Sequence, residues 1–148
     1  MKKIKTVLTA IVMLLSVSSF ATDPENVSAA VKAAFQNDFA KASVVKWDKT
    51  DDFYFASFLL NDVRVDAAYT EEGELIGTSR NIQASQMPLA VSLAIAEKYN
   101  GYQVSDVVTE LTFASATRYY VTVSNEKQSV RLKCFNNGDI EVESKIKK

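Results

Sequence analysis

The chain has 148 residues, of which 47% are hydrophobic, and this composition suits one soluble domain with a packed core. The absence of histidine excludes Ser-His-Asp and Cys-His catalytic arrangements and nearly every zinc site. With four glycines and no CxxC or P-loop pattern, the sequence also lacks the common redox and nucleotide motifs.

The first 21 residues have the pattern of a secretory signal peptide. Lys2, Lys3 and Lys5 precede an apolar stretch from Thr6 to Phe20, which is shorter than a membrane-spanning helix. Small residues flank Phe20 at the expected cleavage point after Ala21. An uncleaved membrane anchor is the alternative, but cleavage is favoured and predicts a periplasmic or secreted protein.

The mature chain that follows would be acidic. It has 127 residues (148 − 21), with 14 basic residues (17 − 3) against 18 acidic ones, a net charge of −4 (14 − 18). Nucleic acids and anionic membranes both select clustered positive charge, so neither is an expected partner. No later apolar run is long enough to span a bilayer, so no membrane insertion is expected after signal cleavage.

One helix and four strands are predicted in the first half of the mature chain. Asp23-Pro24 marks the helix start, since proline is tolerated in a first turn, and the apolar stripe has helical spacing: Val27, Val31, Ala34, Phe35 and Phe39. Short turns then separate four predicted strands, and such links make neighbouring strands antiparallel. The strands are Val44–Asp48, Phe53–Leu60, Val63–Thr70 and Leu75–Asn81.

The second half repeats this order. Pro88 opens a helix whose stripe contains Val91, Ala94, Ile95 and Tyr99, and Asn100-Gly101 ends it because glycine readily takes the left-handed conformation. Four more strands are predicted, again joined by turn residues. They are Val104–Phe113, Thr117–Ser124, Ser129–Phe135 and Ile140–Ile146.

Matching segments indicate an internal duplication. Ala30–Phe35 corresponds to Ala90–Ile95 at an offset of 60, and Tyr54–Phe58 corresponds to Tyr119–Val123 at an offset of 65. We therefore expect an α+β fold: a tandem repeat of a helix plus a four-stranded antiparallel meander, with the helices on one face of the sheet. The expected divisions are 1–21 for the signal, 22–83 for the first repeat and 84–148 for the second, with the repeats packed as one compact unit or joined edge to edge.

Several short motifs recur through both halves of the mature chain. They include Val45-Lys46-Trp47, Tyr54–Phe58, Met87-Pro88, Tyr99–Val104, Arg118–Val121 and the turn glycines Gly73 and Gly138. With these motifs, nearly all of the mature chain resembles the PepSY-like, beta-lactamase-inhibitor-like domains found in exported proteins of Bacteroidota. Phe39 is followed by Ala40 where the family usually has proline. The resemblance implies the tandem architecture and an inhibitor-like shape, but inhibition itself does not follow from a shared fold.

The single cysteine, Cys134, has two possible roles. In an exported protein it is either buried and inert or available for pairing with another chain. Cys134 has the same strand parity as Val130 and Leu132, so it is expected to point into the core.

Acidic clusters are the only remaining candidates for chemistry. They are Asp51-Asp52, Glu71-Glu72-Glu74 and Asp139-Glu141-Glu143. They fall in turns or alternate along a strand, where carboxylates are solvated, and none has the spacing of a dedicated calcium loop. We therefore predict that the protein is not an enzyme and has no cofactor or metal.

Two helices can cover only one face of the predicted strands, and strand parity assigns residues to the other face. Aromatic residues and arginine, which are enriched at recognition surfaces, mix on that face. The partner-binding candidates are Phe55, Arg64, Arg118, Tyr120, Arg131 and Phe135. The alternative is that these residues simply suit strands and pair across them. Trp47 is a further candidate, with a core role equally open.

The sequence leaves three functions open. The leading hypothesis is an exported, non-catalytic binding module that engages a protein through its open sheet face, with enzyme inhibition as one form of that binding. The second is a sensor of a small ligand or envelope component, held between the repeats. The third is self-association through free edge strands.

Overall fold

The structure, a computed structural model, describes residues 26–148. The predicted signal peptide lies outside the described residues, as do Asp23 and Pro24 of the predicted helix start, but the first helix begins only at Ala29, so that predicted start is wrong. The chain divides into two compact units, the first ending at Ser79 and the second running from Arg80 to Lys148. Each unit has one α-helix and antiparallel strands, so the predicted α+β class is confirmed.

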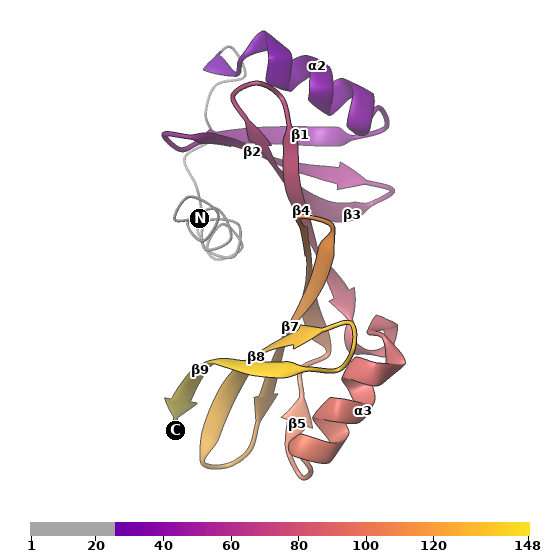
Figure 1. The fold of residues 1–148 in the computed structure, drawn as a ribbon, viewed down its shortest axis with the longest axis vertical. Coiled ribbons are helices and arrows are strands. Elements are labelled where there is room, and N and C mark those ends of the chain that lie inside the picture. The colour runs from indigo at the N-terminus through magenta and orange to yellow at the C-terminus, as the bar shows by residue number, and fades with distance from the viewer. Residues whose placement is uncertain (1–25) are drawn as a thin grey trace. The chain divides into compact units, whose positions relative to one another are not determined.

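The first unit begins with helix α2 (Ala29–Asp38), which lies on one side of the strands of that unit in Figure 1. Ser28 is its N-cap, and the hydroxyl of Ser28 accepts a hydrogen bond from the Val31 amide at 3.3 Å. The strands follow in the spatial order β1-β2-β3-β4. Their bounds are β1 Ser43–Lys49, β2 Phe53–Leu60, β3 Val63–Thr70 and β4 Leu75–Gln83.

One side of the first unit's sheet buries α2. The helix contributes Val31 and Phe35 to a core cluster that also contains Trp47, Tyr54, Ala56, Phe58 and Tyr69. The Phe35 ring packs edge-on against the rings of Trp47 and Phe58, with centroids 5.1 and 5.0 Å apart. Trp47 is therefore a core residue, and the alternating residues of β2 from Tyr54 to Phe58 face the helix.

The second unit contains the end of β4, a 3-10 turn (η2, Ala84–Gln86) and helix α3 (Leu89–Lys98). Pro88 is the N-cap of α3, as the sequence predicted. The strands are β5 Gln103–Val104, β6 Val107–Phe113, β7 Ala116–Ser124, β8 Gln128–Phe135 and β9 Ile140–Lys147. The spatial order is β6-β7-β8-β9, with β5 also paired to β7.

The predicted single strand Val104–Phe113 is wrong, because the chain leaves the strand at Ser105 and Asp106. The Ser105 amide still donates to the Thr122 carbonyl of β7, whereas the Asp106 carbonyl accepts a hydrogen bond from the Ala84 amide, each at 2.9 Å. The register with β7 shifts between the pairs Val104–Val123 and Thr109–Tyr120. β5 and β6 therefore pair with β7 as two separate strands.

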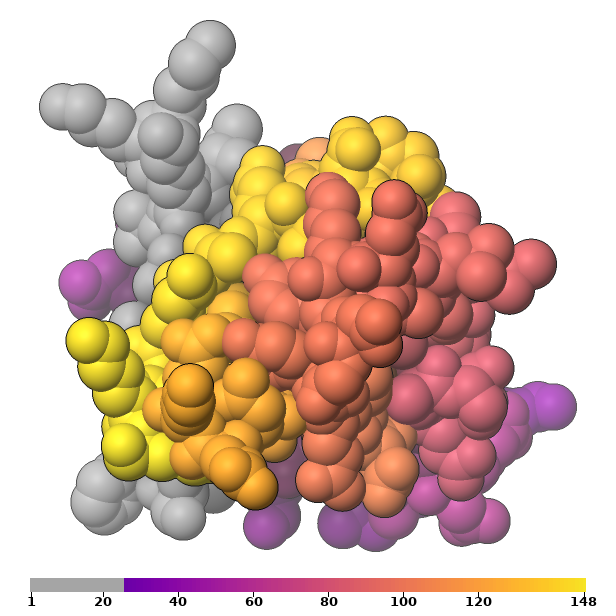
Figure 2. All heavy atoms as spheres, turned by 90° about the horizontal axis from the view of Figure 1, so that it is seen from below, coloured from indigo at the N-terminus to yellow at the C-terminus, as the bar shows by residue number. Residues whose placement is uncertain are grey.

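Helix α3 packs on one side of the strands of the second unit through Val91 and Ile95, which join a cluster with Val121, Leu132 and Cys134. In the space-filling view (Figure 2), the coral α3 region lies over the orange and yellow strand residues of the same unit. The outer side of α3 exposes Leu89 and Leu93. Cys134 is fully buried, which confirms the predicted core position.

Each unit also fixes its helix with a hairpin turn. Gly73 follows β3 with φ +87°, and a Cβ there would lie 2.7 Å from the Ala30 carbonyl oxygen in α2. Gly138 follows β8 with φ +91°, and a Cβ there would lie 2.9 Å from the Ala90 oxygen in α3. Only glycine combines this left-handed conformation with so close an approach of turn to helix.

We predict that Gly138→Ala destabilises the protein far more than Gly101→Ala. Gly101 also has a positive φ, of +83°, but a Cβ there would meet no atom within 4 Å. The left-handed conformation alone costs about 1–2 kcal/mol, and overpacking at Gly138 adds roughly 1–3 kcal/mol. Urea unfolding of both variants measures the difference. Equal losses of stability would show that the contact between turn and helix does not matter.

Candidate functional site

The six predicted contact residues fall into two sets, one in each unit. Phe55 and Arg64 belong to the first unit, on β2 and β3. The other four belong to β7 and β8 of the second unit: Arg118, Tyr120, Arg131 and Phe135. Each set is therefore described within its own unit.

In the first unit the predicted exposure of Phe55 is wrong. Phe55 is only 4% exposed, and its partner across the strands, Ala68, is also buried. Strand parity places Phe55 on the side opposite α2, but parity alone does not determine solvent exposure. The aromatic ring of Phe55 is therefore not available on an open surface of this structure.

Arg64 is exposed, but it has a partner within the same strand. Its guanidinium lies 3.6 Å from a carboxylate oxygen of Asp66, and Asp66 also accepts a hydrogen bond from the hydroxyl of Ser57. Arg64 pairs in register with Leu59, four residues along β2 from Phe55, so the two predicted residues do not form one patch.

The second unit brings its four predicted residues onto one face. Residues paired in register share a face of the sheet, and two adjacent rows cross the strands on the side opposite α3. One row joins Leu111, Arg118 and Phe135 from β6, β7 and β8. The next row joins Thr109, Tyr120, Lys133 and Glu141, the last of them from β9. Arg131 pairs with Thr122 in the row after that.

Tyr120 is the second correction, because it is only 3% exposed. The guanidinium carbon of Arg131 lies 5.5 Å from the centre of its ring, within the range of a cation–π contact. Burial raises the pKa of the Tyr120 hydroxyl, and the nearby Glu143 carboxylate raises it further. Tyr120 is thus a neutral, buried residue within this face.

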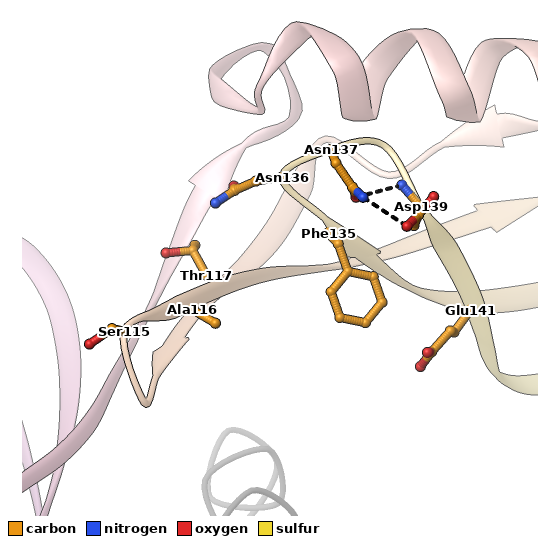
Figure 3. Close-up of a pocket in the computed structure, with 8 residues that line it drawn as sticks. All are labelled: Ser115, Ala116, Thr117, Phe135, Asn136, Asn137, Asp139 and Glu141. Atoms are coloured by element: carbon orange, nitrogen blue, oxygen red, sulfur yellow. Dashed lines mark hydrogen bonds between the residues drawn. The ribbon is translucent and has the colours of Figure 1, made fainter.

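A cavity of about 520 Å³ lies at the end of these rows, where the β6–β7 and β8–β9 turns meet (Figure 3). Phe135 and Glu141 extend into it on the side away from the helix in this view. Asn137 and Asp139 hold the β8–β9 turn, since the Asn137 side chain donates to Asp139 at 2.8 Å and accepts from the Asp139 amide at 3.1 Å. The other lining residues are Ser115, Ala116, Thr117 and Asn136.

Sequence reasoning missed the acidic and apolar members of this face. Glu141 and Glu143 were expected only to face water, but they bond to Lys133 and Arg131 at 2.8 and 3.0 Å. The sequence signal for these ion pairs was the alternation of charged residues along β8 and β9, which form one hairpin. Leu111 and Phe113, which are buried and absent from the cluster around α3, carried no such signal.

Residues 26–148 contain few features of a catalytic or metal site. Within this range no group of three His, Cys, Asp or Glu side chains is placed to hold a metal ion. The one thiol, Cys134, is fully buried, and burial raises its pKa to about 11, so it is a poor nucleophile. Neither helix of the described chain has the length and hydrophobicity needed to cross a bilayer.

Solved structures with the same fold come from Bacteroides. A BLIP-like protein from Bacteroides fragilis matches with a TM-score of 0.68 and 23% identity, over 82% of this chain and 87% of that one. The chain has a BLIP-like fold. A DUF2874 family protein from Bacteroides uniformis has a TM-score of 0.67 and 22% identity, over 81% of this chain and 88% of the other.

A Bacteroides eggerthii structure agrees, with a TM-score of 0.66 and 19% identity over 87% of this chain and 90% of that one. No protein-family model and no curated protein matches the sequence. Because these identities are low, the comparisons establish the BLIP-like fold and leave the PepSY-like resemblance a prediction.

We predict that Tyr120→Ala destabilises the protein by about 3 kcal/mol, the usual cost of removing a buried aromatic side chain. Tyr120→Phe keeps the packed ring and should stay within about 1 kcal/mol of the native protein. Urea unfolding measures both variants. If Tyr120→Ala leaves stability unchanged, Tyr120 is a surface residue and this description of the face is wrong.

We also predict that Cys134 does not react with Ellman's reagent at about pH 8 in the native protein, because its thiol is buried and protonated. It should react fully in concentrated guanidinium chloride. Leu93→Cys supplies an exposed thiol as a control, and this second thiol should react at once. Rapid reaction of Cys134 without denaturant would contradict its place in the core.

Proposed function

We propose that this protein is an exported, non-catalytic binding module that engages a protein partner through the face of the second unit opposite α3. The observation that carries the proposal is the combination on that face of Arg118 and Phe135, which are paired in register, with a cavity of about 520 Å³ beside them. Arginine and aromatic residues dominate the energetics of protein interfaces, and anchors commonly fill such hollows.

Export is supported by the N-terminal pattern of three lysines followed by an apolar stretch. The Bacteroides eggerthii structure of the same fold is also described as periplasmic. The lack of histidine in the whole chain supports a role without covalent chemistry. Inhibition of an exported enzyme is the specific form of binding that the beta-lactamase-inhibitor-like resemblance suggests.

The buried residues narrow the surface to be tested. Phe55 and Tyr120 are packed, so their truncation would confuse loss of binding with loss of stability. Phe135 is partly exposed and lines the cavity, which makes it the sharper probe of recognition. Leu93, exposed on α3, is a matched apolar residue on the other side of the same unit.

We predict that the mature chain captures a specific protein from the envelope fraction of the organism that encodes it. Phe135→Ala should weaken capture about tenfold or more, as loss of a central anchor does, and Leu93→Ala should leave it unchanged. Quantitative mass spectrometry of the bound fraction measures both. Equal capture by the two variants would show that this face does not bind the partner.

The small-ligand alternative predicts a different result. In that case no protein would be retained, and envelope fragments or metabolites would raise the melting temperature of the mature chain. Such a shift, together with no captured protein, would replace protein binding with ligand sensing as the function.

A further inference from the structure

The outward face of β7 and β8 carries three cations, and two of them are already neutralised. The Nε of Arg131 donates to the Glu143 carboxylate at 3.0 Å, and the Nζ of Lys133 donates to the Glu141 carboxylate at 2.8 Å. Both acids come from the neighbouring strand β9. The charges of this hairpin therefore cancel in two cross-strand pairs.

Arg118 is the exception among these cations. Its row partners across the strands are Leu111 and Phe135, neither of which carries a hydrogen-bond acceptor in its side chain. The Nε and Nη1 atoms of Arg118 are shielded from solvent and have no hydrogen-bond partner in the described chain. A shielded guanidinium N–H group without an acceptor is unfavourable, because it has lost water and gained nothing in return.

The first unit does not repeat this feature. At the offset of 65 residues, the position equivalent to Arg118 is Phe53, which pairs with Thr70. The buried acid of that unit, Asp66, is already satisfied by Ser57 and Arg64. The unpaired charge is therefore a property of the second unit and not a requirement of the shared fold.

We propose that Arg118 receives the carboxylate of an aspartate or glutamate side chain from the protein partner, while an apolar group beside that acid packs on Phe135 in the cavity. This inference rests on the proposed function and names the chemistry that the partner must present. A carboxylate accepts two parallel N–H bonds from a guanidinium, which is the geometry that arginine favours.

The surrounding charges favour a single acid over a polyanion. Asp139 and Glu141 line the same cavity, and the mature chain carries a net charge of −4 (14 − 18). A phosphate backbone or an anionic membrane would meet repulsion at both acids, whereas one carboxylate can approach Arg118 alone.

The test uses 3-phenylpropionate as the probe, because it joins one carboxylate to one apolar ring. Its neutral amide, 3-phenylpropanamide, is the matched control ligand. Titrations of the mature chain, followed by NMR, should show the acid binding at least about tenfold more tightly than the amide, the usual effect of a charged hydrogen bond. Equal affinity for the two ligands would overturn the proposal.

Variants then assign the effect to one residue. Arg118→Gln should weaken binding of the acid about tenfold, whereas Arg131→Gln, which removes an already paired cation from the same face, should change it less than about twofold. Equal losses in the two variants would show a general charge effect and overturn the assignment to Arg118.

The stability of an Arg118 variant is a second readout, because a structural role of Arg118 predicts a loss of stability and a binding role does not. Arg118→Met removes the unsatisfied N–H groups and keeps the length of the side chain, so its urea midpoint should equal or exceed that of the native protein. A clearly lower midpoint would make Arg118 a structural residue and overturn the proposal.

The two proposals can fail separately. If Phe135→Ala weakens capture of the protein partner but Arg118→Gln does not, the binding face stands and the carboxylate contact is wrong. If neither variant affects capture while the partner is still bound, the face itself is wrong.

Discussion

The structure depends on the alternation of side chains along each strand, which sends neighbouring residues to opposite sides of the sheet. Tyr119 and Tyr120 illustrate this alternation, because they are adjacent in the sequence and both are buried. Tyr119 belongs to the cluster that holds α3, whereas Tyr120 pairs with Lys133 on the other side. Burial of the helix on one side is therefore what assigns Arg118 and Phe135 to the candidate binding face.

The helix is held by a small number of contacts that recur in each unit. Two turn glycines let a hairpin approach the helix backbone, and two apolar residues of each helix reach the sheet: Val31 and Phe35 in α2, and Val91 and Ile95 in α3. The backbone bonds of the two turns also correspond. Gly73 donates to Thr70 at 3.0 Å, and Gly138 donates to Phe135 at 2.9 Å. These contacts occupy one side of the strands in each unit and leave the other side free to differ, as Arg118 and Phe53 do.

Local patterns predicted much of this fold. The bounds of β2 and β3 match the structure residue for residue, because alternation and turn residues mark them clearly. The break between β5 and β6 was not predictable in this way, since it is a shift of register with β7, from the pair Val104–Val123 to the pair Thr109–Tyr120, that alternation does not mark. The helix cap at Ser28 was also missed, although serine is a common N-cap.

The site was less predictable than the fold, because alternation gives only the side of the sheet on which a residue lies. It gives neither the exposure of that residue nor the partner of its side chain. Phe55 and Tyr120 were placed on the correct side and yet are buried. The isolation of Arg118 follows from strand register, which sets Leu111 and Phe135 beside it and directs Glu141 and Glu143 to other cations.

A cysteine scan along β7 tests the two-sided assignment most directly. Single cysteines replace Arg118, Tyr119, Val121 and Thr122 in a Cys134→Ala background, and their reaction with a charged thiol reagent is timed under conditions where each variant is folded. The account predicts fast modification at positions 118 and 122 and protection at 119 and 121, on the side of α3. Equal rates at all four positions, or protection at 118 and 122 alone, would contradict it.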